Sequence, residues 1–268
     1  MLRAISIALL LVLTAVLGAG CLVREDSEPI DYLQLEDAII IQVLDVPGGL
    51  SPLEARLTLP SFTLYGDGTL IRAAPEADGS VEMTRAEVPE DAVRDLVEFM
   101  VGKGFLETYV FEDPGFDGPS DAATSYIYLN TEQGANSVRA VALDRTAPAG
   151  ASDDHRRLVQ IRNRLMDIDD AAVGGRIEGA YKSEGIALFA QAAEADGDSY
   201  VVWPLGSIDL AKVAGLEGQA GKVLLSQRDA ASLPASRVET FVQGSQAYEV
   251  GYRPALPFEE HFPEFDFP

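Results

Sequence analysis

The hydrophobic residues between positions 54 and 73 alternate with polar ones in a way that predicts a β-hairpin. The turn is predicted at Asp67-Gly68, because a two-residue type I′ turn needs positive φ at both central positions, which glycine adopts freely and aspartate tolerates. Pairing outward from that turn places Tyr65 opposite Leu70. The side chains that would then share one face are Phe62, Leu64, Ile71 and Ala73.

The segment after this hairpin has the periodicity of an amphipathic helix. Its apolar residues recur every three or four positions. They form one core-facing stripe, which consists of Val93, Leu96, Val97, Met100 and Val101. Pro89 suits the first helical position, and Glu90 and Asp91 complement the positive end of the helix dipole. Gly102 and Gly104 can end the helix in a left-handed conformation.

A second hairpin followed by a helix is predicted further along the chain. Residues 124–130 and 137–143 read as its two strands, and Ser152 is a suitable N-cap for the helix that follows. The apolar stripe of this helix would consist of Leu158, Ile161, Leu165 and Ile168. Upstream of both hairpins, residues 38–46 are rich in β-branched side chains and predict a buried strand.

The C-terminal part of the chain is predicted to consist mainly of strands. The predicted elements are a hairpin over residues 186–203 that turns at Asp196-Gly197, a helix over 208–213, a strand over 222–226, and a hairpin over 237–254 that turns at Gly244-Ser245. The tail, residues 255–268, is dense in proline and phenylalanine. We expect it to lie extended along the surface, because proline at this density prevents a helix or a central strand.

These patterns predict an α+β protein with antiparallel sheets built from β-hairpins and two main amphipathic helices packed on them. We expect four parts, and Gly174-Gly175 marks the boundary between the last two. They are a signal peptide over residues 1–20, an acidic tether over 21–37, a hairpin-helix domain over 38–173, and a strand-rich C-terminal portion over 174–268. A chain of 268 residues can form either one large domain or two smaller ones.

The N-terminus has the features of an export signal. Arg3 is a short positive region, residues 5–17 are apolar, and the small residues Gly18-Ala19-Gly20 precede Cys21, the only cysteine. This arrangement resembles the lipobox of bacterial lipoproteins, although leucine stands at Leu17, one position earlier than in the usual pattern. The resemblance implies that Cys21 is lipidated and becomes the mature N-terminus. The alternative is an ordinary secretory peptide followed by a chance cysteine.

The strong negative charge limits the partners of this protein. With 20 Lys+Arg and 43 Asp+Glu, the formal net charge is -23. Such a chain repels nucleic acid and anionic lipid headgroups. We therefore expect no nucleic-acid partner, and we expect attachment to a membrane through acyl chains on Cys21 and not through a basic surface.

Two further stretches resemble uncharacterised exported bacterial proteins. YGDGT at residues 65–69, followed by the helical run VPEDAVRDLVEFMVGKGFLE, is similar to exported domains in which a hairpin precedes a helix with a Gly-Phe-Leu step. Trp203-Pro204-Leu205 and the run YEVGYRPALP at residues 248–257 look like the C-terminal half of bacterial lipoproteins. The resemblance covers most of the mature chain and implies a fold, without an activity.

Residues suited to catalysis are sparse. The only histidines are His155, expected on the surface at a helix start, and His261 in the tail, and no G-x-S-x-G motif occurs. A histidine-dependent hydrolase and a zinc site are therefore disfavoured. One basic cluster is interpreted as a solvated helix face that pairs with nearby acids: Arg156, Arg157, Arg162 and Arg164.

A loop rich in glycine, proline and acids is the one candidate for a metal site. Its oxygen ligands would be Glu112, Asp113, Asp117 and Asp121, a donor set that suits calcium, although the spacing is not that of an EF-hand. We expect no cofactor, with calcium as the alternative. The sequence thus favours a lipid-anchored envelope protein with a non-enzymatic binding or structural role. The alternatives are a carboxylate-dependent envelope hydrolase and a calcium-stabilised surface module.

Overall fold

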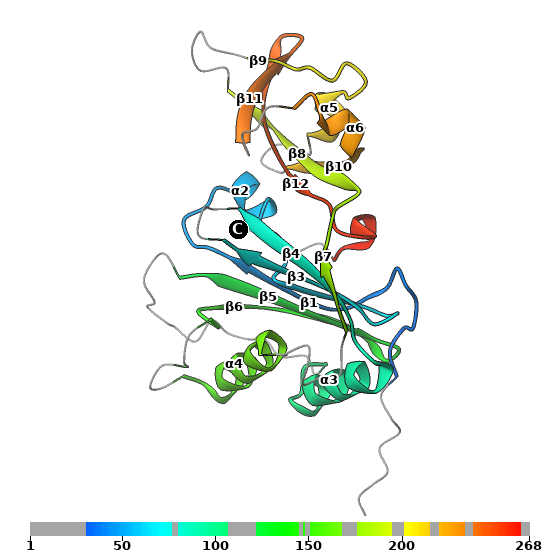
Figure 1. Cartoon of the computed structure of the whole chain (residues 1–268). Coiled ribbons are helices and arrows are strands. Elements are labelled where there is room, and N and C mark those ends of the chain that lie inside the picture. Colours follow the sequence, from blue (N-terminus) through cyan, green and yellow to red (C-terminus); the bar gives the residue numbers. More distant parts are fainter. Residues whose placement is uncertain are drawn as a thin grey trace, which may run out of the picture.

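The computed structural model describes most of the chain downstream of the predicted export signal. The described residues are 31–76, 80–106, 122–144, 147, 151–167, 176–194, 201–214, 220–233 and 238–263. The protein is an α+β protein with two separate β-sheets, and nearly all of the strand pairs are antiparallel. Figure 1 shows the larger sheet in the middle, two helices on one of its faces and the smaller sheet on the other.

The larger sheet has seven strands in the order β6-β5-β1-β2-β3-β4-β7, and all of its neighbouring strands are antiparallel. Its strands are β1 (Ile39–Val46), β2 (Phe62–Tyr65), β3 (Thr69–Pro75), β4 (Val81–Glu87), β5 (Thr124–Thr131), β6 (Gly134–Val141) and β7 (Arg176–Ala180). The predicted buried strand at residues 38–46 is β1, an interior strand of this sheet. The predicted hairpin at 124–143 is β5 and β6.

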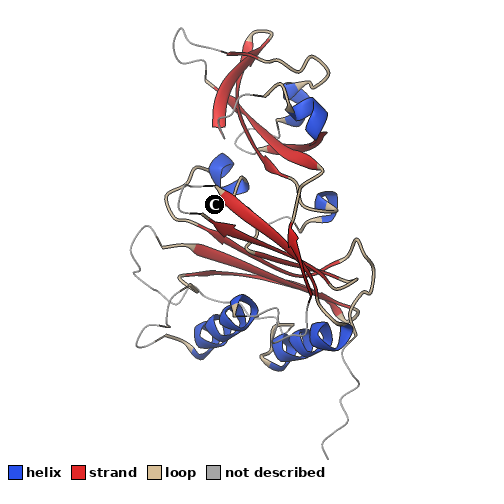
Figure 2. Ribbon diagram, viewed as in Figure 1, coloured by secondary structure: helices blue, strands red, loops and turns tan. Residues whose placement is uncertain are grey.

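Two helices cover one face of the larger sheet (Figure 2). They are α3 (Glu90–Gly102), where Pro89 is the N-cap, and α4 (Asp153–Met166), where the Ser152 side chain accepts a hydrogen bond from the backbone N–H of His155. Their buried residues belong to the largest hydrophobic core, together with residues of β1, β2 and β5. Tyr32, upstream of β1, is buried in the same core. None of the helices in the described part of the chain has the length and apolar character needed to span a membrane.

The smaller sheet has five strands in the order β10-β8-β12-β11-β9. They are β8 (Gly185–Ala193), β9 (Val201–Val202), β10 (Gly221–Ser226), β11 (Val238–Gln243) and β12 (Gln246–Pro254), accompanied by the short helices α5 (Leu210–Val213) and α6 (Gln227–Ala230). Its core includes Trp203 and Phe241, whose rings meet edge to face with centroids 5.0 Å apart. The predicted turn at Gly244-Ser245 is confirmed, because Gln243 pairs with Gln246.

The short helix α2 (Pro52–Arg56) lies between the two sheets. Ser51 and Glu54 form a capping box at its start, which explains why this segment leaves the extended conformation that the sequence pattern predicted from residue 54 onward. Ala55 packs on the larger sheet, whereas Leu53 packs against Phe189 of β8 in the smaller sheet. The helix therefore serves as a shared hydrophobic spacer between the two layers.

A buried ion pair joins the smaller sheet to the C-terminal segment. Arg253 of β12 donates to both carboxylate oxygens of Glu259 at 2.6 and 2.9 Å, and the two side chains are only 9% and 0% exposed. Glu259 begins the 3-10 helix η1 (Glu259–His261) and also accepts from the backbone N–H of Leu256. The Arg253 guanidinium additionally donates to the backbone oxygen of Arg56 in α2. One salt bridge thus fixes three separate segments.

The first hairpin has a different register from the predicted one. Leu64 pairs with Leu70, so the loop contains three residues, Gly66 to Gly68, and only Gly68 among them has a positive φ, +86°. The two-residue turn at Asp67-Gly68 and the pairing of Tyr65 with Leu70 were therefore wrong. A slip of one residue exchanges the faces of a strand. As a result, Phe62 and Leu64 face the helices, whereas Ile71 and Ala73 belong to a core on the opposite face.

Two other features of the sheets differ from the expectation. The predicted hairpin at Asp196-Gly197 is wrong, because β8 pairs with β10 and β12, while β9 runs parallel to β11 at the opposite edge. The polar spacer between the first hairpin and α3 contains β4, which pairs with β3 and continues the meander. Strand β7, from the predicted C-terminal portion, closes this edge of the larger sheet by pairing with β4.

His155 is buried, in contrast to the surface position expected at a helix start. Its exposed fraction is 3%, and burial lowers the pKa of its imidazole. Three of the clustered arginines on the same helix pair with acids, as interpreted from the sequence: Arg156 with Asp153, Arg157 with Asp154, and Arg162 with Asp45 of β1. The Arg162 pair is largely buried, so it attaches the helix to the sheet in addition to pairing charge.

Candidate functional site

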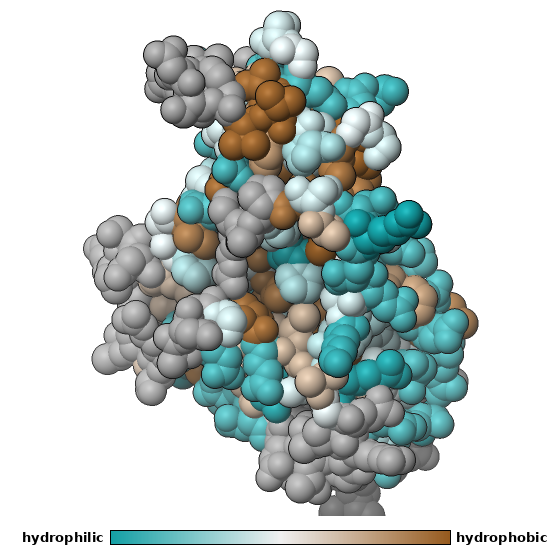
Figure 3. Space-filling view, turned by 45° about the horizontal axis from the view of Figure 1, so that its top comes forward, coloured by the Kyte–Doolittle hydropathy of each residue, from teal (hydrophilic) through white to brown (hydrophobic). Residues whose placement is uncertain are grey.

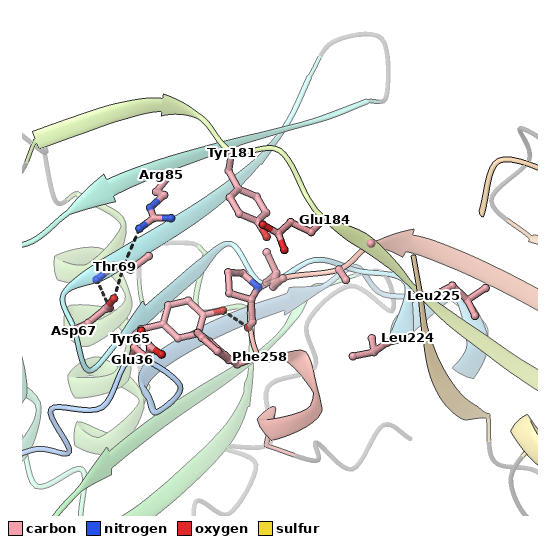
Figure 4. A pocket seen from close by; sticks show the side chains of 14 residues that line it. Glu36, Tyr65, Asp67, Thr69, Arg85, Tyr181, Glu184, Leu224, Leu225 and Phe258 are labelled. Carbon is pink, nitrogen blue, oxygen red and sulfur yellow. Dashed lines mark hydrogen bonds between the residues drawn. The ribbon is translucent and has the colours of Figure 1, made fainter. Parts of the chain in front are cut away.

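A cavity of about 440 Å³ lies where the two sheets meet. It is bounded by strands of the larger sheet, by the connection from β7 to β8, by β10, and by the segment after β12. Figure 4 shows the side chains that point into it. Its lining includes Glu36, Tyr65, Asp67, Thr69, Arg85, Tyr181, Glu184, Leu224, Leu225, Leu256 and Phe258.

Tyr65 forms part of the floor of this cavity. It is the last residue of β2, and because side chains alternate along a strand it lies on the opposite face from Leu64, away from α3 and α4. Its hydroxyl donates to the backbone oxygen of Pro257 at 2.8 Å, and its ring meets the Phe258 ring edge to face with centroids 6.1 Å apart. Burial raises the pKa of the phenol, and the nearby Tyr181 and Glu259 raise it further. Tyr65 is therefore a neutral hydrogen-bonding group at physiological pH.

Tyr181 comes from the connection between β7 and β8 and approaches the cavity from another side (Figure 4). Burial raises its pKa, and the neighbouring carboxylate of Glu184 adds to the effect. The Ser183 hydroxyl, in the same connection, lies within hydrogen-bond distance of the backbone oxygens of both Gly185 and Ala255, at 2.5 and 2.6 Å, and its single proton is shared between the two crossings between the sheets. These bonds fix the backbone that carries Tyr181 and Glu184.

Charged groups line one edge of the cavity. Asp67 accepts from the backbone N–H of Thr69 at 2.8 Å and from its hydroxyl at 3.0 Å, and Arg85 of β4 donates to that hydroxyl at 3.4 Å (Figure 4). Glu36 and Glu184 are exposed carboxylates at the same cavity. Carboxylates therefore outnumber cationic groups among its lining residues.

Leu224 and Leu225 of β10 supply an apolar wall, and Leu224 is 39% exposed although it is a large hydrophobic residue. Figure 3 shows further exposed apolar residues on the smaller sheet, where Val201, Val202 and Val238 are exposed. Combined with the three aromatic rings, the apolar wall makes the cavity amphipathic. Its volume is in the range of small-molecule sites, about 300–1,000 Å³.

The candidate residues from the sequence are placed as follows. Cys21, the proposed lipidation site, and the candidate calcium ligands Glu112, Asp113, Asp117 and Asp121 lie outside the described residues. Within the described ranges, no group of three or more His, Cys, Asp or Glu side chains could hold a metal ion. The Nδ1 atom of His261 lies 3.6 Å from a carboxylate oxygen of Asp37. His155 is buried on α4, which covers the opposite face of the larger sheet, so the two histidines do not share a site.

Sequence reasoning singled out the hairpin of the cavity floor without assigning it a site. Asp67 and Gly68 are recognisable from the sequence as turn residues, but the predicted register was wrong by one residue and placed Ile71 and Ala73 on the face of Leu64 instead of that of Tyr65. Tyr181 and Glu184 belong to no motif. They reach the site because β7 and β8 belong to different sheets, which local periodicity does not reveal. No protein-family model, curated protein or solved structure matches this chain.

The raised pKa of Tyr65 predicts a change of stability at high pH. Up to about pH 10 the phenol is protonated in both the folded and the unfolded chain. Above that pH the unfolded chain loses the proton more readily, so the stability of the native protein falls by up to about 1.4 kcal/mol per pH unit for this group.

Tyr65→Phe tests this linkage. At pH 7 the variant should be about 1 kcal/mol less stable, because the Pro257 carbonyl loses its donor. The deficit should shrink between about pH 10 and 11, since phenylalanine has no proton to lose. Urea denaturation of both proteins from pH 7 to 11 measures the difference. A deficit that stays constant over that range would contradict the assignment.

Proposed function

We propose that this protein is exported, attached to the bacterial envelope by lipid on Cys21, and engaged in non-enzymatic ligand binding. The proposal assigns residues 1–20 to a signal peptide and 21–37 to an acidic tether, followed by the hairpin-helix and strand-rich parts at 38–173 and 174–268. The apolar run, the small residues and the cysteine at the N-terminus support the anchoring. The lipidated cysteine would attach the chain without requiring a basic surface, which suits its net charge of -23.

The observation that carries the binding role is the amphipathic cavity between the sheets. Its two tyrosines have raised pKa values caused mainly by burial, so they remain neutral at physiological pH. Neutral phenols donate and accept hydrogen bonds and offer ring faces to a ligand, but they do not act as bases or nucleophiles at that pH. The cavity chemistry therefore favours recognition over proton transfer.

Lipidation is tested on the full-length chain produced in a bacterial host. Mass spectrometry of the mature protein should find Cys21 at the N-terminus, with the added mass of acyl chains. Cys21→Ala should move the protein from the membrane fraction to the soluble fraction. A free thiol at Cys21, or a mature N-terminus several residues downstream, would contradict the anchor.

Binding is tested by native mass spectrometry of protein purified from envelope fractions. We expect a retained small molecule that is lost on denaturation, and we expect Tyr181→Ala to reduce its occupancy, because one aromatic wall of the cavity is removed. Tyr252→Ala serves as the matched control, since Tyr252 is a partly buried tyrosine of β12 that does not line the cavity. Equal loss in both variants would contradict a site in the cavity.

The carboxylate-dependent hydrolase remains the second candidate function, because Glu36, Asp67 and Glu184 line one cavity. A hydrolase would release a chemically altered ligand during incubation, whereas a binding protein returns the molecule unchanged. Comparing the mass of the released molecule with that of the molecule supplied separates the two functions. The proposal of a calcium-stabilised loop at Glu112–Asp121 rests on the acidic residues of the sequence.

A further inference from the structure

We infer that the cavity between the two sheets binds an organic cation, an ammonium group carried on an apolar stem. This inference rests on the proposed binding function and specifies the chemistry of its ligand. Three properties of the lining residues support it: the sign of their charge, the presence of aromatic rings, and an apolar wall placed next to both.

The charge of the cavity favours a cation. Its lining contains three carboxylates, Glu36, Asp67 and Glu184, and one guanidinium, Arg85. Among the described residues, neither Glu36 nor Glu184 forms an ion pair, and both are exposed to an entering ligand. Carboxylates in this position can bind the ammonium group directly.

The aromatic groups favour an organic cation over a bare metal ion. Tyr65, Tyr181 and Phe258 present ring edges or faces to the cavity, and the electron-rich face of an aromatic ring attracts ammonium groups. Because the two phenols stay neutral, they add hydrogen-bond acceptors without adding charge. The residues do not form a compact set of carboxylate ligands of the kind that calcium requires.

The apolar wall defines the remainder of the ligand. Leu224, Leu225 and Leu256 line the cavity beside the aromatic rings, and a hydrocarbon stem in contact with them would cover Leu224, which is exposed. The negative charge of the whole chain adds a long-range attraction for cations and repels anions. Arg85, the one cationic group of the lining, donates to the hydroxyl of Thr69, and that hydroxyl in turn donates to the carboxylate of Asp67.

The test uses three probes of equal length and different charge: hexylammonium, hexanol and hexanoate. Each is titrated into the mature full-length protein by calorimetry at constant ionic strength, which removes general charge screening as a cause of differences. We expect hexylammonium to bind more tightly than hexanol and hexanol more tightly than hexanoate. A second arm compares hexylammonium with a short blocked peptide containing one lysine, and tighter binding of the peptide would identify the source of the cation as a protein side chain.

Matched variants locate the binding. The double variant Glu36→Gln/Glu184→Gln should weaken hexylammonium binding by about fivefold or more, and Arg85→Gln should tighten it. The control is Glu98→Gln/Glu132→Gln, which removes the same charge from exposed positions on α3 and the β5-β6 loop. Its affinity should match that of the unmodified protein.

The outcomes separate this inference from the proposed function. If hexanol or hexanoate binds as tightly as hexylammonium and Tyr181→Ala abolishes that binding, the cation assignment is overturned while the binding function stands. If both double variants weaken hexylammonium equally, the attraction comes from the whole surface and the inference is wrong. If no probe binds and no molecule is retained on purification, both the inference and the binding function are wrong.

Discussion

Glu259→Gln is expected to lower the free energy of unfolding by about 3–5 kcal/mol, the typical cost of leaving one partner of a buried ion pair uncompensated. The substitution preserves the shape of the side chain but removes the charge that faces Arg253. The Arg253 side chain is 9% exposed and donates to Glu259 through two nitrogens, so water cannot replace the lost carboxylate without opening the junction. The other acceptors of the guanidinium are backbone oxygens of Arg56 and Pro254, which carry no formal charge.

An exposed ion pair of similar geometry provides the control. Arg94 and Glu90 are separated by 2.8 Å on α3, close to the 2.6 Å of the buried pair, but their side chains are 37% and 60% exposed. Glu90→Gln should therefore cost at most about 1 kcal/mol, because solvent screens the exposed pair. The contrast attributes the larger effect to burial and not to the length of the bond.

A double-mutant cycle completes this test. Arg253→Met combined with Glu259→Gln removes both charges, and we expect the pair to lose at least about 2 kcal/mol less than the sum of the two single variants. Urea denaturation of the four proteins provides the energies. Additive losses would show that Arg253 and Glu259 stabilise the fold independently of each other.

Gly68→Val is expected to destabilise the fold by about 2–5 kcal/mol through two effects that add. The first is conformational, since Gly68 has a φ of +86°, which β-branched residues strongly disfavour. The second is steric, because a Cβ atom at this position would lie 2.3 Å from the backbone oxygen of Val88. That oxygen belongs to the segment between β4 and α3, so relieving the clash requires the strand or the helix to move.

Gly102→Val is the matched control for this prediction. Gly102 ends α3, its φ is not positive, and a Cβ atom would meet no other heavy atom within 4 Å. The free energy of unfolding of the Gly102→Val protein should differ from that of the unmodified protein by less than about 0.5 kcal/mol. Equal denaturation midpoints for Gly68→Val and the unmodified protein would mean that the hairpin turns at other residues.

The sequence was sufficient to predict the elements that depend on local patterns. The helix α3 begins and ends close to the predicted positions because its apolar stripe and its acidic first turn are local features. The turn at Gly244-Ser245 was predicted for the same reason. The register of the first hairpin could not be predicted in this way, because Gly66-Asp67-Gly68 permits either a two-residue or a three-residue loop. The choice between the two loops depends on packing against the segment before β1. A Cβ at Gly66 would lie 2.0 Å from the backbone oxygen of Leu33.

The candidate site could not be predicted from local sequence patterns. Its residues come from the segment before β1, the first hairpin, β4, the β7-β8 connection, β10 and the segment after β12, which meet only when the two sheets pack. The placement of β9 illustrates the same limit. It follows β8 in sequence, but it pairs in parallel with β11, and both β11 and β12 lie between it and β8 in the sheet. The alternation of apolar and polar residues along a strand does not indicate which other strand it pairs with.

The junction between the sheets has a consequence for the order in which the chain folds during synthesis. The chain passes from the larger sheet to the smaller one after Ala180 and returns at Ala255. The two crossings are joined by a hydrogen bond from the backbone N–H of Ala255 to the backbone oxygen of Gly185. The residues that cover Ile71, Ala73 and Met83, on the face of the larger sheet away from α3 and α4, include Leu256, Phe258 and Phe262, which follow β12. A nascent or prematurely terminated chain that stops at Pro254 would expose that apolar face and leave Arg253 buried without Glu259. The core on this face of the larger sheet can therefore close only after Leu256, Phe258 and Phe262 have been synthesised.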